Sequence, residues 1–216
     1  MRNVTRQLLG WFGIMGLLLV GLESPAMALT YQVTVDTSTL NGTTGYVDLQ
    51  FNPGTITAPG AQAALSSFAG PTLISNDPQT GATGNVTGAL PGSLLFSNTT
   101  VYNDYFQAVT FGTTTSFNVN FSGAFTTASS GSNTTFSLSL YDATGTNPIF
   151  TTDPLGFGSI LRMDLAPGGG ITTFNTAINP SAVSVAAVPV PAAVVLFGSG
   201  LIGLLGWQRK RLSKTV

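Results

Sequence analysis

Hydrophobic and polar residues alternate along several stretches in the middle of the chain. In SFNVNF, Phe117, Val119 and Phe121 share one face, while the two Asn residues between them share the other. Such alternation is what a half-buried antiparallel strand requires, because successive side chains point to opposite faces of a sheet. The pattern predicts strands at residues 31–35, 46–52, 93–97, 105–111, 115–123, 134–142 and 158–165.

Turn-forming residues separate these stretches, with Asn-Gly, Pro-Gly or Asp-Ala-Thr-Gly groups at residues 41–42, 53–54, 91–92, 142–145 and 167–168. Short strands with frequent turns predict an all-β domain, an antiparallel β-sandwich of the jelly-roll type. Residues 58–70, APGAQAALSSFAG, depart from the alternation, and we expect a loop or an irregular strand there. We expect residues 183–188 to form a last strand or a linker.

The first residues of the chain have a different character. MRNVTRQ carries two Arg, residues 8–22 are uncharged and apolar, and Ala26-Met27-Ala28 follows Pro25. A positive start, an apolar run of about 15 residues and an A-x-A site specify a secretory signal peptide. We predict that signal peptidase removes residues 1–28 by cutting after Ala28, so that the mature chain begins at Leu29. A retained N-terminal anchor is the alternative, for which the apolar run is short.

Residues 188–216 have the pattern of a membrane tail. Val188, Pro189, Val190 and Pro191 precede an uncharged stretch, residues 192–207, that ends at Trp207. Counted from Val188, the roughly 20 apolar residues are enough for a transmembrane helix, with Trp207 at the membrane interface. The basic residues that follow stay on the cytoplasmic side by the positive-inside rule: Arg209, Lys210, Arg211 and Lys214.

The VPVP motif, the apolar helix and the basic end together resemble the PEP-CTERM sorting domain of Gram-negative bacteria, with Val190 where that family's motif has Glu. The resemblance implies processing by exosortase, a membrane enzyme with a catalytic Cys, and transfer from the inner membrane to the cell envelope, surface or extracellular matrix. GYVDLQFNPG, GNVTGALPGSLLFSN and NDYFQAVTFG resemble one group of exported PEP-CTERM proteins, which implies an exported domain over residues 29–187. A C-terminal anchor that is never removed is the alternative.

Composition limits the chemistry of the exported domain. The chain has no His and no Cys, which removes the imidazole base, the thiol nucleophile and the ordinary zinc and copper ligands. Between the two ends, one Arg against seven Asp leaves a net charge of about −6, so nucleic acid is a poor partner. We therefore expect no enzyme and no catalytic residues. An envelope hydrolase using Asp104 and Asp142 is the least favoured alternative.

Two kinds of ligand are compatible with the remaining residues. Calcium is one, with Asp142 and Asn147 of the DATGTNP turn as oxygen ligands, although their spacing is not that of an EF-hand. Polysaccharide is the other, if aromatic side chains line an open sheet face: Tyr31, Tyr46, Tyr102, Tyr105, Phe106 and Tyr141. The expected function is a structural or adhesive component of the exopolysaccharide matrix of a biofilm. The alternative is a carbohydrate-binding module that tethers the cell to its polysaccharide.

Overall fold

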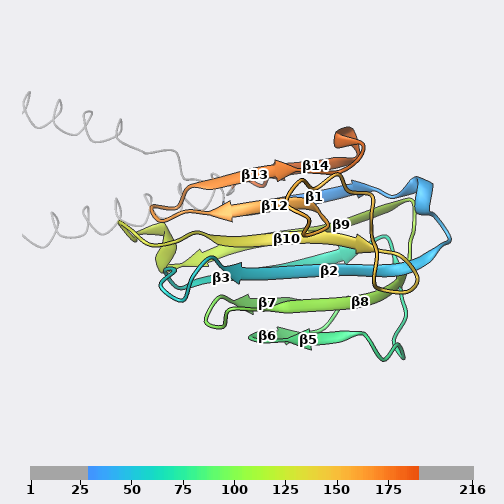
Figure 1. Ribbon diagram of the computed structural model, residues 1–216, viewed down its shortest axis with the longest axis horizontal. Coiled ribbons are helices and arrows are strands. Elements are labelled where there is room, and N and C mark those ends of the chain that lie inside the picture. The colour runs from blue at the N-terminus through green and yellow to red at the C-terminus, as the bar shows by residue number, and fades with distance from the viewer. Residues whose placement is uncertain (1–28, 190–216) are drawn as a thin grey trace, which may run out of the picture. The chain divides into compact units, whose positions relative to one another are not determined.

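The computed structural model describes residues 29–189. These residues form two antiparallel sheets packed face to face, a β-sandwich (Figure 1). The compact unit runs from Leu29 to Val188. The predicted signal peptide, the second half of the VPVP motif, the helix at 192–207 and the basic tail with Trp207 lie outside the described residues. Within residues 29–189, no helix has the length and apolar character needed to cross a membrane.

Each sheet has six strands in its main order, and the strand pairings are antiparallel. In sheet A the order is β14-β1-β9-β3-β7-β6, with bounds Val183–Ala187, Thr30–Asp36, Thr114–Gly123, Ala61–Ala69, Leu94–Ser97 and Val86–Gly88. In sheet B the order is β13-β12-β10-β2-β8-β4, with bounds Ile171–Asn175, Ser159–Leu165, Thr134–Tyr141, Thr44–Pro53, Asp104–Thr110 and Thr72–Leu73. Two short strands join sheet B off this path: β11 (Pro148–Ile149) beside β10 and β5 (Gly81–Thr83) beside β8.

The inward rows of the alternating strands form the core between the sheets. All seven predicted strands are confirmed within two residues at each end. Phe121 on β9 and Phe136 on β10 are fully buried, and their rings meet edge to face with centroids 5.8 Å apart. Phe117 contacts Phe136 from the same side at 6.2 Å. Because burying one such side chain contributes about 1.5–3 kcal/mol, this cluster stabilises the contact between the two sheets.

Of the loop or irregular strand expected at residues 58–70, the structure shows the irregular strand. The segment contains β3, a strand of nine residues in the interior of sheet A between β9 and β7. Ala61, Ala63 and Leu65 point into the core, so the alternation is present but is carried by small alanines with weak strand preference. The expected irregularity is real only near the end of the strand, where the register shifts between Ser66 and Ala69. Tertiary pairing on both sides of β3 overrides its local preference.

The last strand and the short edge strands complete the sandwich. Residues 183–187 form β14, so the strand and not the linker is correct. The Val188 N–H donates to the Thr30 carbonyl at 2.8 Å, which brings the two ends of the compact unit together beside β1. Alternation does not predict β4, β5, β6, β11 and β13, because strands of two to five residues are too short to show a period.

Candidate functional site

Polar side chains cover the outer face of three neighbouring strands of sheet B. In Figure 1 this face is toward the viewer, with β12, β10 and β2 lying side by side. The pairing registers align the outward residues in three cross-strand rungs: Asn52–Thr135–Asp164, Gln50–Ser137–Arg162 and Asp48–Ser139–Ser159. All of these residues except Asp48 line a groove with a volume of about 410 Å³. This volume is in the range of ordinary small-ligand sites.

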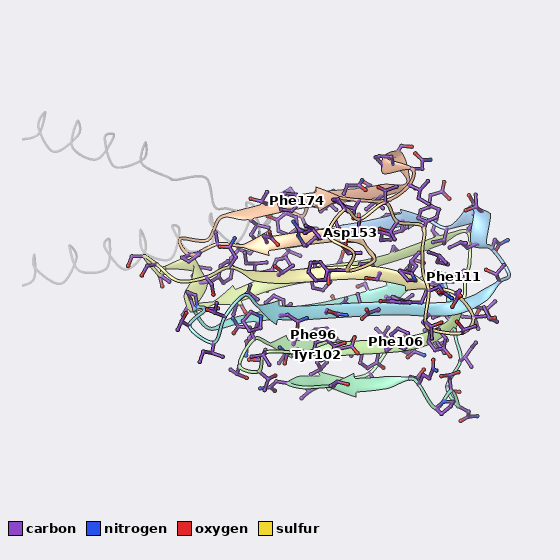
Figure 2. All side chains as sticks on the ribbon, viewed as in Figure 1. Phe96, Tyr102, Phe106, Phe111, Asp153 and Phe174 are labelled. Atoms are coloured by element: carbon purple, nitrogen blue, oxygen red, sulfur yellow. The ribbon has the colours of Figure 1, made fainter. Side chains whose placement is uncertain are left out.

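A loop between β10 and β12 forms one wall of the groove. It presents Leu155 and Phe157, whose side chains are 56% and 71% exposed. Asp153 shapes the loop by accepting hydrogen bonds from the backbone N–H groups of Leu155 and Phe157 and from the Ser159 hydroxyl. Although burial acts against them, these hydrogen bonds lower the pKa of Asp153. Figure 2 shows Asp153 in this loop in front of the sheet.

The charged residues of the groove neutralise one another. The Arg162 Nε lies 3.4 Å from Asp164 Oδ1, and the Thr135 hydroxyl donates to that same oxygen at 2.8 Å. The Arg162 guanidinium also lies over the Phe174 ring of β13, 4.5 Å from its centroid. Phe174 is 39% exposed, so it extends the groove floor with an aromatic surface (Figure 2). The floor is therefore polar but without net charge.

The six aromatic residues considered for sugar stacking do not form one open face. Tyr46, Phe106 and Tyr141 do share the outer face of sheet B, but they pack on one another, with the Tyr46 and Phe106 rings stacked at 4.6 Å. Tyr105 is buried in the core, where its hydroxyl accepts a hydrogen bond from the Leu90 N–H. Tyr31 packs against Phe121 on sheet A. The exposed aromatic residues beside the groove are instead Phe157 and Phe174, which the sequence analysis did not single out.

The turn that holds Asp142 and Asn147 is closed by its own hydrogen bonds. Asp142 Oδ1 accepts from the Thr144 hydroxyl at 2.6 Å and from its backbone N–H at 3.1 Å. Asp142 Oδ2 accepts from the Asn147 amide at 2.7 Å. These bonds lower the pKa of Asp142 to about 2. Hydrogen bonds within the turn therefore account for the position of this carboxylate.

A buried pair of carboxyl groups lies at the end of the groove floor. Asp48 on β2 is 3% exposed and Asp104 at the start of β8 is 9% exposed. Burial and the adjacent Asp104 carboxyl raise the pKa of Asp48 to about 9. The Gln50 amide donates to Asp48 Oδ2 at 2.8 Å and accepts from the Asn52 amide at 3.0 Å, which links the pair to the groove. Asp104 is therefore paired with Asp48 and not with Asp142.

The nearness of Asp48 and Asp104 cannot be predicted from the sequence, for a physical reason. The alternation in YVDLQFN is enough to place Asp48 on the polar face of its strand. Nothing in the sequence says that β8 lies beside β2 with Asp104 opposite Gln50, so the approach of the two carboxyl groups follows only from the pairing register.

Comparison with known proteins gave no match, whether with family models, curated proteins or solved structures. Any function of the groove has therefore to be inferred from its own residues.

Proposed function

We propose that this chain is an exported, non-enzymatic protein whose β-sandwich binds a neutral polysaccharide in the groove of sheet B. The observation that carries the proposal is the combination of a polar, uncharged floor with exposed Phe157 and Phe174 beside it. Sugars present hydroxyl groups at their edges and C–H groups on their faces. A floor of amides and hydroxyls flanked by aromatic rings complements both.

The charge of the domain supports a neutral glycan as the ligand. Arg162 is the one basic residue between positions 29 and 189, and Asp164 neutralises it. An anionic polymer would therefore meet a domain with an excess of Asp and no unpaired cation in this part of the chain. The groove offers a cationic polymer one carboxylate, that of Asp164. This carboxylate is already bonded to Arg162 and Thr135.

The same features support binding without turnover. Glycoside hydrolysis uses two carboxyl groups about 5 to 9.5 Å apart on either side of the sugar bond. Asp164 is the acidic residue that lines the groove, and Arg162 and Thr135 hold its carboxylate. The Asp48 and Asp104 carboxyl groups contact each other below the surface, so no gap between them can hold a sugar bond.

We place this domain in the route that the sequence predicts. Signal peptidase would cut before Leu29, and an exosortase-like enzyme would process the chain near Val188-Pro189-Val190-Pro191. In support, the last core side chain of the unit, Val183, precedes this motif, so cleavage after Val188 would leave the sandwich intact. The proposal includes delivery to the envelope or matrix of a Gram-negative bacterium, where the domain would act as an adhesive component. It also assigns the sandwich to the jelly-roll type.

Retention on immobilised neutral polysaccharides tests the binding proposal. We expect the full-length chain to bind saturably, and Phe157→Ala to weaken binding about tenfold, because burying a Phe side chain contributes about 1.5–3 kcal/mol. Leu95→Ala is the matched control, since Leu95 is 40% exposed on β7 of the other sheet. Absence of saturable retention, or equal binding by Phe157→Ala, would instead favour a purely structural matrix protein.

The intact mass of the product made in its native host tests the sorting proposal. A mass that lacks Met1–Ala28 and the residues after about Val188 would establish both processing steps. A product that keeps Trp207 and the basic tail would show a permanently anchored protein and overturn the sorting proposal.

A further inference from the structure

Four loops meet at one end of the sandwich, the left end in Figure 1, which we call the exit end. They are residues 54–60, 98–103, 124–133 and 166–170. The Asn98 amide of the second loop donates to the Pro59 carbonyl of the first at 2.8 Å. The Gly54 N–H donates to the Asn133 carbonyl at 2.8 Å, and two N–H groups of the fourth loop donate to the Phe125 carbonyl. These bonds join the four loops into one surface.

The four loops of the exit end contain no charged residue. The nearest charged side chains lie within strands, where Asp104 is 9% exposed and Asp164 is paired with Arg162. The opposite end of the sandwich, which we call the acidic end, carries the remaining acidic residues of the loops and strand ends: Asp36, Asp77, Asp142 and Asp153. The two ends of the sandwich therefore differ in charge.

Large apolar side chains project from two of the uncharged loops. Ile56 is 86% exposed, Val101 is 64% exposed, and Tyr102 next to it in the chain is 47% exposed (Figure 2). Ile56 and Val101 line the same hollow, which has a volume of about 260 Å³ and whose other lining residues are small or uncharged. Apolar tips with a tyrosine beside them suit the boundary between the headgroups and the acyl chains of a lipid bilayer.

The chain enters and leaves the compact unit at the exit end. The Val188 N–H donates to the Thr30 carbonyl at 2.8 Å, and the Leu29 carbonyl accepts from the Phe121 N–H at 2.9 Å. Three residues, two of them Pro, separate Val188 from the apolar run predicted to cross the membrane at 192–207. Three extended residues span at most about 11 Å, whereas the headgroup layer is about 5–8 Å thick. A chain held by this run therefore has its exit end close to the headgroups.

We propose that, in the membrane-held intermediate of the proposed sorting route on which this inference rests, the exit end lies on the lipid bilayer. Ile56, Val101 and Tyr102 insert among the headgroups, where their apolar surface leaves water. The hydroxyl and amide groups around them stay at the polar level of the membrane surface. The acidic end points away from the bilayer, whose anionic lipids repel carboxylates. Short linker, apolar tips and uncharged loops thus favour one orientation of the domain.

Single cysteines test the orientation, because the chain contains no Cys of its own. Ile56→Cys or Val101→Cys is labelled with the fluorophore NBD, and the full-length chain is reconstituted in vesicles of phosphatidylethanolamine and phosphatidylglycerol. The matched control is Ile178→Cys, which is 63% exposed in the segment between β13 and β14 at the acidic end. Apolar groups at the interface lie about 5–10 Å deep, so lipids with a nitroxide near the headgroup should quench positions 56 and 101 at least about twofold more than position 178.

A charge placed at the tip of the first loop gives a second measurement. Ile56→Asp, added to the labelled Val101→Cys chain, should lower the quenching at position 101 toward that of the control, because a carboxylate is costly to remove from water. Ile56 is 86% exposed, so this substitution leaves the packing of the sandwich unchanged. Quenching at position 101 that is the same with and without Ile56→Asp would contradict insertion of the two loops together.

Flotation of the vesicles separates the possible failures. A chain that does not float with the vesicles would overturn the membrane-held intermediate and the orientation together. A chain that floats, but whose labels at positions 56 and 101 are quenched no more than the label at position 178, would overturn the orientation alone and leave the sorting proposal standing. Shielding of both labels that depends on protein concentration and not on the nitroxide lipid would assign the exit end to a second copy of the chain, and would likewise overturn the proposal.

Discussion

The free energy of unfolding should fall as the pH rises from 5 to 8, and Asp48→Asn should remove that fall. The folded protein holds the pKa of Asp48 at about 9, against an ordinary value of 3.8 in the unfolded chain. Between these two values the folded state carries one more proton than the unfolded state. Unfolding then releases a proton, so a rise in pH favours the unfolded chain.

The magnitude follows from the same two numbers. Each pH unit between the two pKa values changes the free energy of unfolding by about 1.4 kcal/mol, so the interval from pH 5 to 8 accounts for about 4 kcal/mol. Asp48 is 3% exposed, so solvent screening reduces this figure little. In Asp48→Asn the amide keeps a donor for the Asp104 carboxyl and does not titrate. We expect its free energy of unfolding to be higher at pH 7 by up to about 4 kcal/mol.

The assay is urea unfolding of the full-length chain followed by far-ultraviolet circular dichroism, at several pH values. The chain contains no His, so this pH window is free of histidine titration. The hydrogen-bonded carboxylates of Asp36, Asp142 and Asp153 have lowered pKa values and stay ionised throughout the window. Asp36→Asn, at the end of β1, is the control and should keep the slope of the unaltered chain.

Two results would refute the reasoning. One is a free energy of unfolding that stays constant or rises between pH 5 and 8. The other is the same slope in Asp48→Asn as in the unaltered chain, which would mean that Asp48 is ionised in the folded protein.

Three further substitutions test the core, a close backbone approach and the groove wall. Phe136→Ala should lower the free energy of unfolding by about 3–5 kcal/mol in a urea titration, because it opens a cavity between the sheets; a loss below 1 kcal/mol would contradict the packing. Gly45→Ala should destabilise the fold strongly, since its Cβ would lie 2.3 Å from the Tyr141 carbonyl oxygen, whereas Gly60→Ala meets no atom within 4 Å and is the control. Asp153→Ala should weaken polysaccharide retention by loosening the groove wall; unchanged retention would mean that the loop does not contribute.

The sequence predicts the sandwich well because its strands are half buried. The alternation within each stretch is enough to indicate which residues face the core. Phe117 and Val119 on β9 are examples. β3 is the strand that the alternation indicates least clearly, because Ala61 and Ala63 are as well buried as the larger side chains but give almost no hydrophobic contrast. Its position between β9 and β7 supplies the strand structure that its own residues do not favour.

The candidate site is much less predictable from the sequence. Alternation assigns Gln50, Ser137 and Arg162 to polar faces of three strands, but it does not say that these strands are neighbours or that the three residues align. The same holds for Phe157, which looks like an ordinary loop residue until Asp153 and Ser159 are seen to hold its loop over the sheet. Pairing register, a property of the folded chain, creates both the groove and the carboxylate pair.

The three rungs of the groove floor also set the length of oligosaccharide that the floor can contact. Side chains on one face of a strand recur about every 6.7 Å, and neighbouring strands lie about 4.8 Å apart. Three rungs across three strands therefore make a periodic lattice about 14 Å long and 10 Å wide. A lattice of that extent has a fixed number of places for sugar rings. Affinity should accordingly rise with the length of an oligosaccharide until the lattice is full, and further units should extend past the floor without tightening the complex.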